Sequence, residues 1–277
     1  MNYRHEYHAG NFADVHKHIA LMAALRHLKK KAKPFAVIDT HAGRGLYALD
    51  SDEACRSGEA ADGIAKFRNY EPQSPLLREY LDMVRSFGPA KYPGSPLIVA
   101  KSLRLQDRCA AIEKHPAEFA ALRQTLVPFR QAGAIEGDGY LLLPRQLPPK
   151  ESRGLVLIDP PYEEPDEFAR LGQTVPAAVR KFATGVYLIW YPLKLASRVD
   201  ALAGELLAAG VTDLLKPTMD VGCEPNAGNR LSAAGLLVIN PPYEFDAEMR
   251  AASDEILPLL ARGPAAHAAV EWVARRT

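Results

Sequence analysis

The stretch Gly154-Leu-Val-Leu-Ile-Asp159-Pro160-Pro161-Tyr162 decides the fold class of this 277-residue chain. Its apolar run predicts a strand that is buried on both faces, as the strands of parallel sheets are. Two consecutive prolines end the strand, because neither has an N–H group with which to continue the ladder. The stretch therefore brings a carboxylate, a rigid turn and an aromatic ring to the carboxyl end of a strand.

Asp159, Pro160 and Tyr162 suit a planar substrate that carries an amino group. The carboxylate and the proline carbonyl can each accept one N–H of that group, and the tyrosine can stack on the ring that bears it. Asp-Pro-Pro-Tyr is typical of methyltransferases that act on amino groups of adenine, cytosine or glutamine. Taken alone, the motif is also compatible with a loop that merely ends a strand.

Composition indicates a globular protein with a substantial core. The length and a hydrophobic content of 48% fit one large α/β domain with an insertion. No apolar run approaches a membrane span and the polar start is not a signal peptide, so we expect a cytoplasmic protein without membrane contact. Cys55, Cys109 and Cys223 form no CxxC pair, which argues against a disulfide framework and against a zinc site.

A net charge of +1 does not indicate a nucleic-acid partner, so any contact with a polyanion must come from a local patch. The densest cationic run is Arg26-His-Leu-Lys29-Lys30-Lys31-Ala-Lys33. It is compatible with an RNA contact, and equally with a solvated helix end whose cations complement the helix dipole.

Apolar strands alternate with helical segments, which predicts a mostly parallel, doubly wound sheet. The expected strands are 35–39, 109–113, 134–136, 155–158, 185–191, 214–219, 235–239 and 267–273. The expected helices are 16–31, 97–103, 116–126, 168–182 and 195–209. No helical pattern separates 214–219 from 235–239, so these strands are expected to be antiparallel neighbours. Five parallel strands followed by an antiparallel pair is the layout of Rossmann-like methyltransferases.

The alternation breaks between residues 48 and 92, where acidic residues, glycines and prolines surround short helical pieces such as 76–87. We interpret 48–92 as a small helical insertion. The main domain then consists of residues 1–47, which include an N-terminal arm, and residues 93–277.

Acids or glycine turns follow four of the predicted strands, at Asp39 to Gly45, Glu113, Asp138 and Asp159. Ligands of such sheets lie beyond the carboxyl ends of the strands. Gly43 and Gly45 let the backbone pass close to a ligand, but no third glycine follows at the dinucleotide spacing, which argues against NAD. Glu113 fits a carboxylate that accepts both hydroxyls of a ribose, and Asp138-Gly139 could hold an adenine edge. A surface acid and an ordinary turn are the respective alternatives.

A second segment, Gly235-Leu-Leu-Val-Ile-Asn240-Pro-Pro-Tyr243, nearly repeats the first. Asn-Pro-Pro-Tyr is itself a methyltransferase motif. If the strand before Asn240 is antiparallel, its end points away from the edge where the cofactor binds. We therefore assign the chemistry to Asp159 and a structural role to Asn240.

Polar and aromatic residues crowd the start of the chain, from Tyr3-Arg4-His5 to Lys17-His18. The histidines do not match zinc spacing, and no metal site is expected. Asn11 or Asp14 could simply cap the next helix. Alternatively, the arm could gate the pocket, with its first residues contacting phosphate or stacking on an extruded base.

A set of short motifs is spread over essentially the whole chain. They are Tyr3-Arg4-His5, Ala9-Gly10-Asn11-Phe12-Ala13-Asp14, Lys17-His18, Asp39-Thr-His-Ala-Gly43, Tyr92-Pro-Gly-Ser95-Pro-Leu-Ile, Glu113-x-His-Pro116, Asp159-Pro-Pro-Tyr-Glu163, Arg180-x-Phe182-Ala-Thr-Gly185 and Trp190-Tyr-Pro192. In combination they resemble the RlmJ family, 23S ribosomal RNA adenine-N6 methyltransferases that modify the adenine conventionally numbered 2030. The combination is more specific than Asp-Pro-Pro-Tyr, which DNA adenine methyltransferases share. The insertion and the loop 221–230 look divergent.

The resemblance implies a Rossmann-like S-adenosylmethionine-dependent methyltransferase fold with an inserted small helical subdomain. Asp159 would be the catalytic acceptor, assisted by Pro160 and Tyr162. The residues implied to bind the cofactor are Lys17, His18, His41, Gly43, Ser95, Glu113, Asp138, Gly139 and Asp159. Those expected to contact 23S rRNA are Tyr3, Arg4, His5 and Tyr162. No apolar stripe demands a dimer, so we expect a monomer without an obligate protein partner.

Three alternatives remain open from the sequence. The same chemistry could act on DNA or on a protein glutamine, since nothing in the motif excludes either. A nucleic-acid-binding protein without catalysis would leave the acid, the glycines and the ring without a purpose. A nicotinamide oxidoreductase lacks its third glycine.

Overall fold

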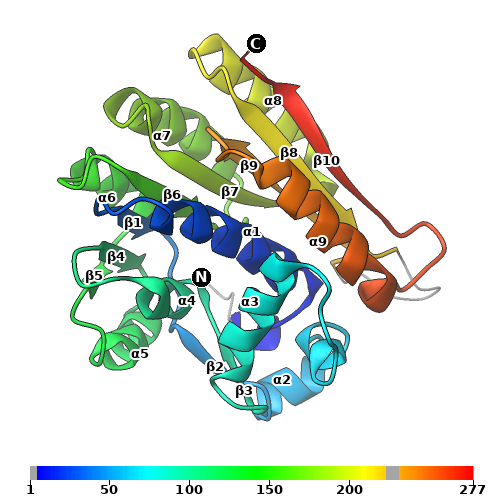
Figure 1. The fold of residues 1–277 in the computed structure, drawn as a ribbon. Coiled ribbons are helices and arrows are strands. Elements are labelled where there is room, and N and C mark those ends of the chain that lie inside the picture. Colours follow the sequence, from blue (N-terminus) through cyan, green and yellow to red (C-terminus); the bar gives the residue numbers. More distant parts are fainter. Residues whose placement is uncertain (1–4, 223–230, 277) are drawn as a thin grey trace.

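The computed structural model describes residues 5–222 and 231–276, and its centre is an eight-stranded sheet in the order β10-β8-β9-β7-β6-β1-β4-β5 (Figure 1). Its parallel part consists of β1 (Ala36–Asp39), β4 (Arg108–Glu113), β5 (Ala132–Glu136), β6 (Gly154–Ile158) and β7 (Val186–Pro192). The remaining strands are β8 (Leu214–Asp220), β9 (Ala233–Ile239) and β10 (His267–Ala274). β9 runs antiparallel to both β7 and β8, which confirms the predicted layout and the predicted antiparallel pair.

Helices cover both faces of the sheet (Figure 1). One face carries α1 (Phe12–Lys29), α4 (Ser95–Ser102), α5 (Pro116–Leu126) and α9 (Phe245–Leu260). The other carries α6 (Gly139–Gln146), α7 (Glu167–Lys181) and α8 (Ala196–Ala208). Strand β6 is buried throughout because its side chains alternate between these layers: Leu155 and Leu157 join the first core, Val156 and Ile158 the second.

The first helix begins at Phe12, four residues earlier than expected, because Asn11 caps it. The Asn11 side chain accepts a hydrogen bond from the N–H of Asp14 at 2.9 Å, which confirms the capping role proposed for Asn11. Every residue from Phe12 to Leu25 is buried. A helix that is buried on all sides has no clear polar face, and this hid its first turn.

A two-stranded sheet of β2 (Leu46–Ala48) and β3 (Lys91–Pro93) joins the insertion to the main domain. Between them lie α2 (Asp52–Ser57), η2 (Ile64–Phe67) and α3 (Pro75–Arg85). Leu77 and Tyr80 of α3 belong to the same core as α1, so the insertion shares its apolar core with the main domain.

Two helices, α6 and α9, were not expected from the sequence. Both contain an internal proline, Pro144 and Pro258 respectively, which weakens the local helical pattern. In α9 the spacing of Phe245, Met249 and Ile256, all buried, is a helical signal that could have revealed it. No helix in the described part of the chain is both long and apolar enough to cross a membrane.

Candidate active site

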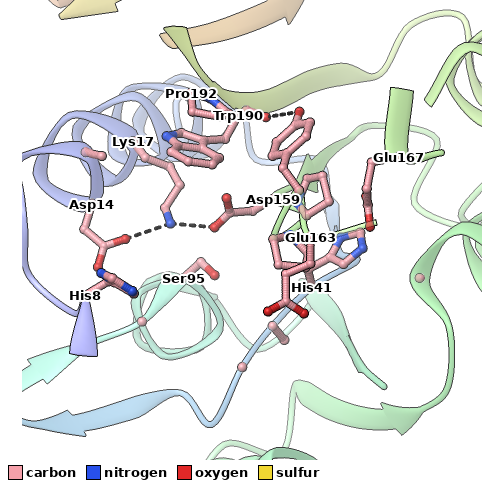
Figure 2. Close-up of a pocket in the computed structure, with 18 of the residues that line it drawn as sticks. His8, Asp14, Lys17, His41, Ser95, Asp159, Glu163, Glu167, Trp190 and Pro192 are labelled. Carbon is pink, nitrogen blue, oxygen red and sulfur yellow. Dashed lines mark hydrogen bonds and ion pairs between the residues drawn. The ribbon is translucent and has the colours of Figure 1, made fainter. Parts of the chain in front are cut away.

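A cavity of about 660 Å³ opens at the carboxyl ends of the parallel strands, where the sequence placed the ligand (Figure 2). Its size is within the usual range for small-molecule sites. It is lined by all the residues expected to bind the cofactor, namely Lys17, His18, His41, Gly43, Ser95, Glu113, Asp138, Gly139 and Asp159. Pro160 and Tyr162 also line it, so the two expected halves of the site form one space.

Glu113 follows β4 and is held in place by backbone groups. Its Oε2 accepts from the N–H of Gly43 at 2.8 Å, and its Oε1 accepts from the N–H of His115 at 2.6 Å. Burial raises the pKa of Glu113, and these backbone donors oppose the shift. Each carboxylate oxygen has a further lone pair, so the group is prearranged to accept two more hydrogen bonds, as a ribose diol requires.

Asp138 is engaged by cations that the sequence did not indicate. Arg170 of α7 donates to both of its oxygens at 2.7 Å, and Lys114 approaches to 3.1 Å. Burial opposes ionisation, yet the hydrogen bonds from Arg170 and Lys114 lower the pKa of Asp138 to about 2. Asp138 also caps α6 through the N–H of Tyr140, so it both fixes this wall and faces the cavity.

Gly139 is required by close packing. A Cβ at this position would lie 2.1 Å from the carbonyl oxygen of Thr40, in the turn after β1. Only glycine permits this approach between the two walls of the cavity.

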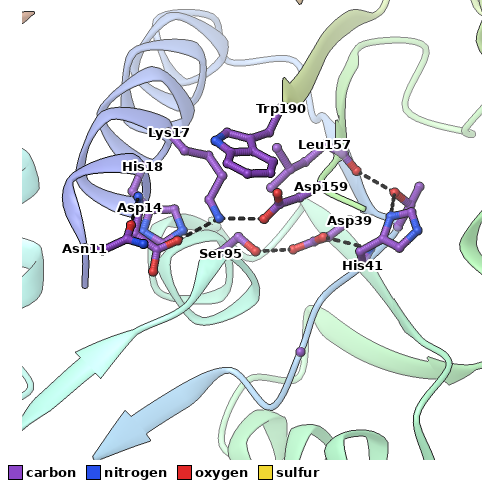
Figure 3. A network of polar contacts seen from close by, with 12 residues as sticks. Asn11, Asp14, Lys17, His18, Asp39, His41, Ser95, Leu157, Asp159 and Trp190 are labelled. Carbon is purple, nitrogen blue, oxygen red and sulfur yellow. Dashed lines mark hydrogen bonds and ion pairs between the residues drawn. The ribbon is translucent and has the colours of Figure 1, made fainter. Parts of the chain in front are cut away.

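Lys17 makes two ion pairs at the reactive end of the cavity (Figure 3). Its ammonium lies 2.5 Å from Asp159 Oδ2 and 2.8 Å from Asp14 Oδ1, and the residue is only 4% exposed. Asp14 is itself fixed by the N–H of Gly10 at 2.9 Å. Although burial opposes the charge, the two carboxylates raise the pKa of Lys17. Lys17 therefore orients Asp159 directly. The sequence analysis expected Lys17 to bind the cofactor and did not predict this contact with Asp159.

Asp39 lies behind the cavity wall and is fully buried. Ser95 Oγ donates to its Oδ2 at 2.7 Å, and burial raises the pKa of Asp39 to about 7 (Figure 3). Because the hydroxyl hydrogen of Ser95 points at Asp39, the lone pairs of Ser95 are directed elsewhere and can accept a donor from the cavity.

Two of the histidines that line the cavity, His18 and His41, each lie within hydrogen-bond distance of a hydroxyl group. His18 Nδ1 lies 2.7 Å from the Tyr92 hydroxyl, which ties α1 to the neck of the insertion. His41 Nδ1 lies 2.8 Å from Thr40 Oγ1. Burial lowers the pKa of His41 to about 4, so its imidazole is neutral at pH 7.

Tyr162 is held with a left-handed backbone, at a φ of 54°. Its hydroxyl donates to the carbonyl of Trp190 at 2.6 Å, and its ring packs against Phe168 and Trp190. A non-glycine residue in this region needs support from its surroundings. These contacts supply that support and place the ring on the cavity wall.

Asn240 lies at the opposite edge of the sheet, as its antiparallel strand predicted. Its amide donates to the carbonyls of Ala183 and Gly185 at 2.9 and 2.8 Å. It does not line the cavity, and its hydrogen bonds hold the loop that leads into β7 in place. The geometry is that of a structural residue.

The N-terminal arm is described only from His5, which begins η1 (His5–Tyr7). Tyr3 and Arg4 lie outside the described residues, as does the side chain of His5. Glu6 forms an ion pair with Arg44 of the glycine turn, and His8 lies 3.0 Å from Glu59 of the insertion. The described arm is thus attached both to the glycine turn and to the insertion, and His8 helps to line the cavity. Of the loop 221–230, only Val221 and Gly222 are described.

Comparison with known proteins adds independent information. The sequence model of the family described as "Ribosomal RNA large subunit methyltransferase D, RlmJ" matches residues 32–274. The chain is 36% identical to the Escherichia coli K12 protein named ribosomal RNA large subunit methyltransferase J, over 99% of both chains. It is 38% identical to the Haemophilus influenzae protein of the same name, over 95% of this chain and 93% of that one. The crystal structure of protein LPL1258 from Legionella pneumophila superposes with a TM-score of 0.84 at 31% identity, covering 96% of this chain and 98% of the other.

Proposed function

The chain belongs to the RlmJ family of ribosomal RNA large subunit methyltransferases, and on this premise we propose that it methylates N6 of an adenine in 23S rRNA, the one numbered 2030. The cofactor is S-adenosylmethionine. The observation that carries the proposal is that Asp159, Pro160 and Tyr162 share one cavity with Glu113. An acceptor for an amino group and an acceptor for a ribose thus lie in one space.

The lining residues fit S-adenosylmethionine in charge and in hydrogen bonding. Acidic side chains outnumber lysine and arginine around the cavity, which suits a positively charged sulfonium. The prearranged Glu113 carboxylate matches the two hydroxyls of its ribose. When bound, the cofactor supplies a methyl group that its sulfonium makes reactive.

The side chains of this site would prepare the amino group of adenine for attack. N6 is a poor nucleophile because its lone pair is delocalised into the ring. Hydrogen bonds from its two N–H groups to Asp159 and to the Pro160 carbonyl favour a pyramidal nitrogen and aim the lone pair. Lys17 pairs with Asp159 and orients its carboxylate for this purpose. Orientation and charge stabilisation suffice for attack, and after transfer one N6 proton passes to Asp159 or to water.

A base within an RNA helix must leave its stack to reach Asp159. Stacking on Tyr162 would offset part of that cost, by roughly 1–3 kcal/mol. The ring is already fixed by the hydrogen bond from its hydroxyl to the Trp190 carbonyl, so little of its side-chain entropy remains to be lost on binding.

We propose that the protein acts as a monomer.

The test is methyl transfer from labelled S-adenosylmethionine to three acceptors: 23S rRNA from cells that lack this gene, adenine-containing DNA, and a glutamine peptide. We expect label in the RNA alone, recovered as N6-methyladenosine and mapped to one nucleotide by mass spectrometry. Asp159→Asn should transfer the methyl group at least about 100-fold more slowly and still bind cofactor. Label in DNA or in the peptide, or none in the RNA, would overturn the proposal.

A further inference from the structure

The basic run after the first helix lies outside the cavity, and its first member differs from the rest. The Arg26 guanidinium contacts Glu79 and Glu248, each at 3.1 Å, so its charge is neutralised within the fold. Arg26 therefore contributes little to any external field.

The turn at residues 30–34, between α1 and β1, carries exposed lysines at 30, 31 and 33. Within residues 5–222 and 231–276, no carboxylate lies at ion-pair distance from these lysines. We call Lys30, Lys31 and Lys33 the basic turn.

The backbone of the basic turn is held by two further cations. Arg104 donates to the carbonyls of Lys31 and Lys33 at 2.8 and 3.1 Å. Arg153 donates to the carbonyls of Lys33 and Leu28, both at 3.1 Å. The turn is therefore fixed through its carbonyl oxygens, which leaves the lysine side chains free to meet a partner.

The positive charges of this region reinforce one another. Burial, together with the nearby charges of Lys30, Arg153 and Lys31, lowers the pKa of His27. Asp107 is an acid of this region, but it is fully buried and accepts its hydrogen bonds from Arg104 and the N–H of Phe35. It neutralises Arg104 and leaves the charge of the lysines in place.

The basic turn and the cavity lie at opposite edges of the sheet. The turn and Arg153 immediately precede β1 and β6, whereas Asp39 and Asp159 stand at or just past the carboxyl ends of these strands. Strand β6 alone, at about 3.3 Å per residue, keeps the two edges roughly 15 Å or more apart. A ligand that touches both must be large.

We propose that the basic turn, with Arg153, binds the phosphate backbone of the substrate RNA at a distance from the target nucleotide. The inference rests on the proposed function, because an RNA that places one nucleotide in the cavity is a polyanion large enough to reach the basic turn as well. Lysines on a rigid turn suit phosphates, which demand charge without base specificity. Binding should then depend on RNA size: a folded domain of 23S rRNA reaches both edges, and a synthetic hairpin that presents the target adenine on a stem shorter than this separation does not.

The test compares a triple variant, Lys30→Gln with Lys31→Gln and Lys33→Gln, with a control of equal charge change. The control is Arg130→Gln with Arg145→Gln and Lys181→Gln, three exposed positions that do not line the cavity. KM for methylation and binding by fluorescence anisotropy are measured for the hairpin and for the full RNA domain over a range of salt. Melting temperature and cofactor affinity verify folding.

On the domain, the triple variant should raise KM about tenfold or more. It should also reduce the slope of log binding constant against log salt concentration by about 2, since each phosphate contact contributes ~0.7–0.9 to that slope. On the hairpin it should behave like the wild type, as should the control on both RNAs. An unchanged KM on the domain, or an equal loss on the hairpin, would overturn the inference and leave the turn to another acidic partner. A wild type that methylates neither RNA would instead overturn the proposed function.

Discussion

The two Pro-Pro-Tyr segments offer the sharpest test of the site, because they have similar sequences and opposite expected roles. Asn240→Ala should destabilise the fold and spare catalysis. It removes two hydrogen bonds to the loop before β7, each contributing about 0.5–1.5 kcal/mol. It also places alanine at a φ of 52°, where a side chain other than asparagine costs about 1 kcal/mol or more. The sum is about 2–4 kcal/mol.

Asp159→Asn should have the reverse effect. The amide keeps the shape of the side chain and an oxygen for Lys17, whose second partner Asp14 remains at 2.8 Å. Asparagine is the cleaner replacement, because alanine would leave a buried ammonium with one carboxylate fewer. Loss of the charge that orients the amino group should slow methyl transfer at least about 100-fold.

The assay pairs thermal melting with methyl transfer at 25 °C for each variant. At about 2–4 °C per kcal/mol for a chain of this size, Asn240→Ala should melt about 5–15 °C below the wild type. Asn69→Ala and Asp166→Asn, both at exposed positions, are the matched controls. A well-folded Asn240→Ala that has lost turnover, beside an active Asp159→Asn, would refute the argument from strand direction.

Three further results are expected. Glu113→Gln should weaken cofactor binding by roughly 1.5–3 kcal/mol in calorimetry, and unchanged affinity would remove Glu113 from the site. Burial raises the pKa of Asp39 from 3.8 to about 7, so the native state binds the extra proton and wild-type stability should fall as pH rises across that interval. The free energy of unfolding of Asp39→Asn, measured in urea, should lack this fall with pH. The same dependence on pH in the variant and the wild type would contradict the prediction. Tyr3→Ala should lower methylation strongly while cofactor affinity and melting temperature stay the same; parallel losses would make the arm a structural cover.

The sheet was predictable because its signals are local. Strand β6 is an uninterrupted apolar run, and the direction of β9 followed from the lack of a helical pattern before it. Apart from the start of α1, the predicted boundaries agree with the structure within two residues. The start of α1 was missed because a helix buried on every side lacks the polar stripe by which a boundary is recognised.

The chemistry of the cavity was predictable only in part, because its decisive contacts join distant residues. Lys17 and Asp159 are separated by 142 positions, and Arg170 and Asp138 by 32. No periodicity encodes such pairs. The sequence could identify the acids at the strand ends, but not which of them a cation would fix, and therefore not that Lys17 serves Asp159.

The charges around the cavity bear on where RNA affinity must come from. The rim includes Glu163 and Glu164, both exposed, next to the ring expected to meet the target base. An acid-rich cavity attracts a cationic cofactor and repels phosphates, so the target nucleotide gains little electrostatic affinity where it reacts. Binding energy gathered away from the reacting centre can offset the cost of extruding a base. The basic turn, at the opposite end of the sheet, supplies such energy. The net charge of +1 does not reveal it, because the acids around the cavity offset the lysines of the turn in the total.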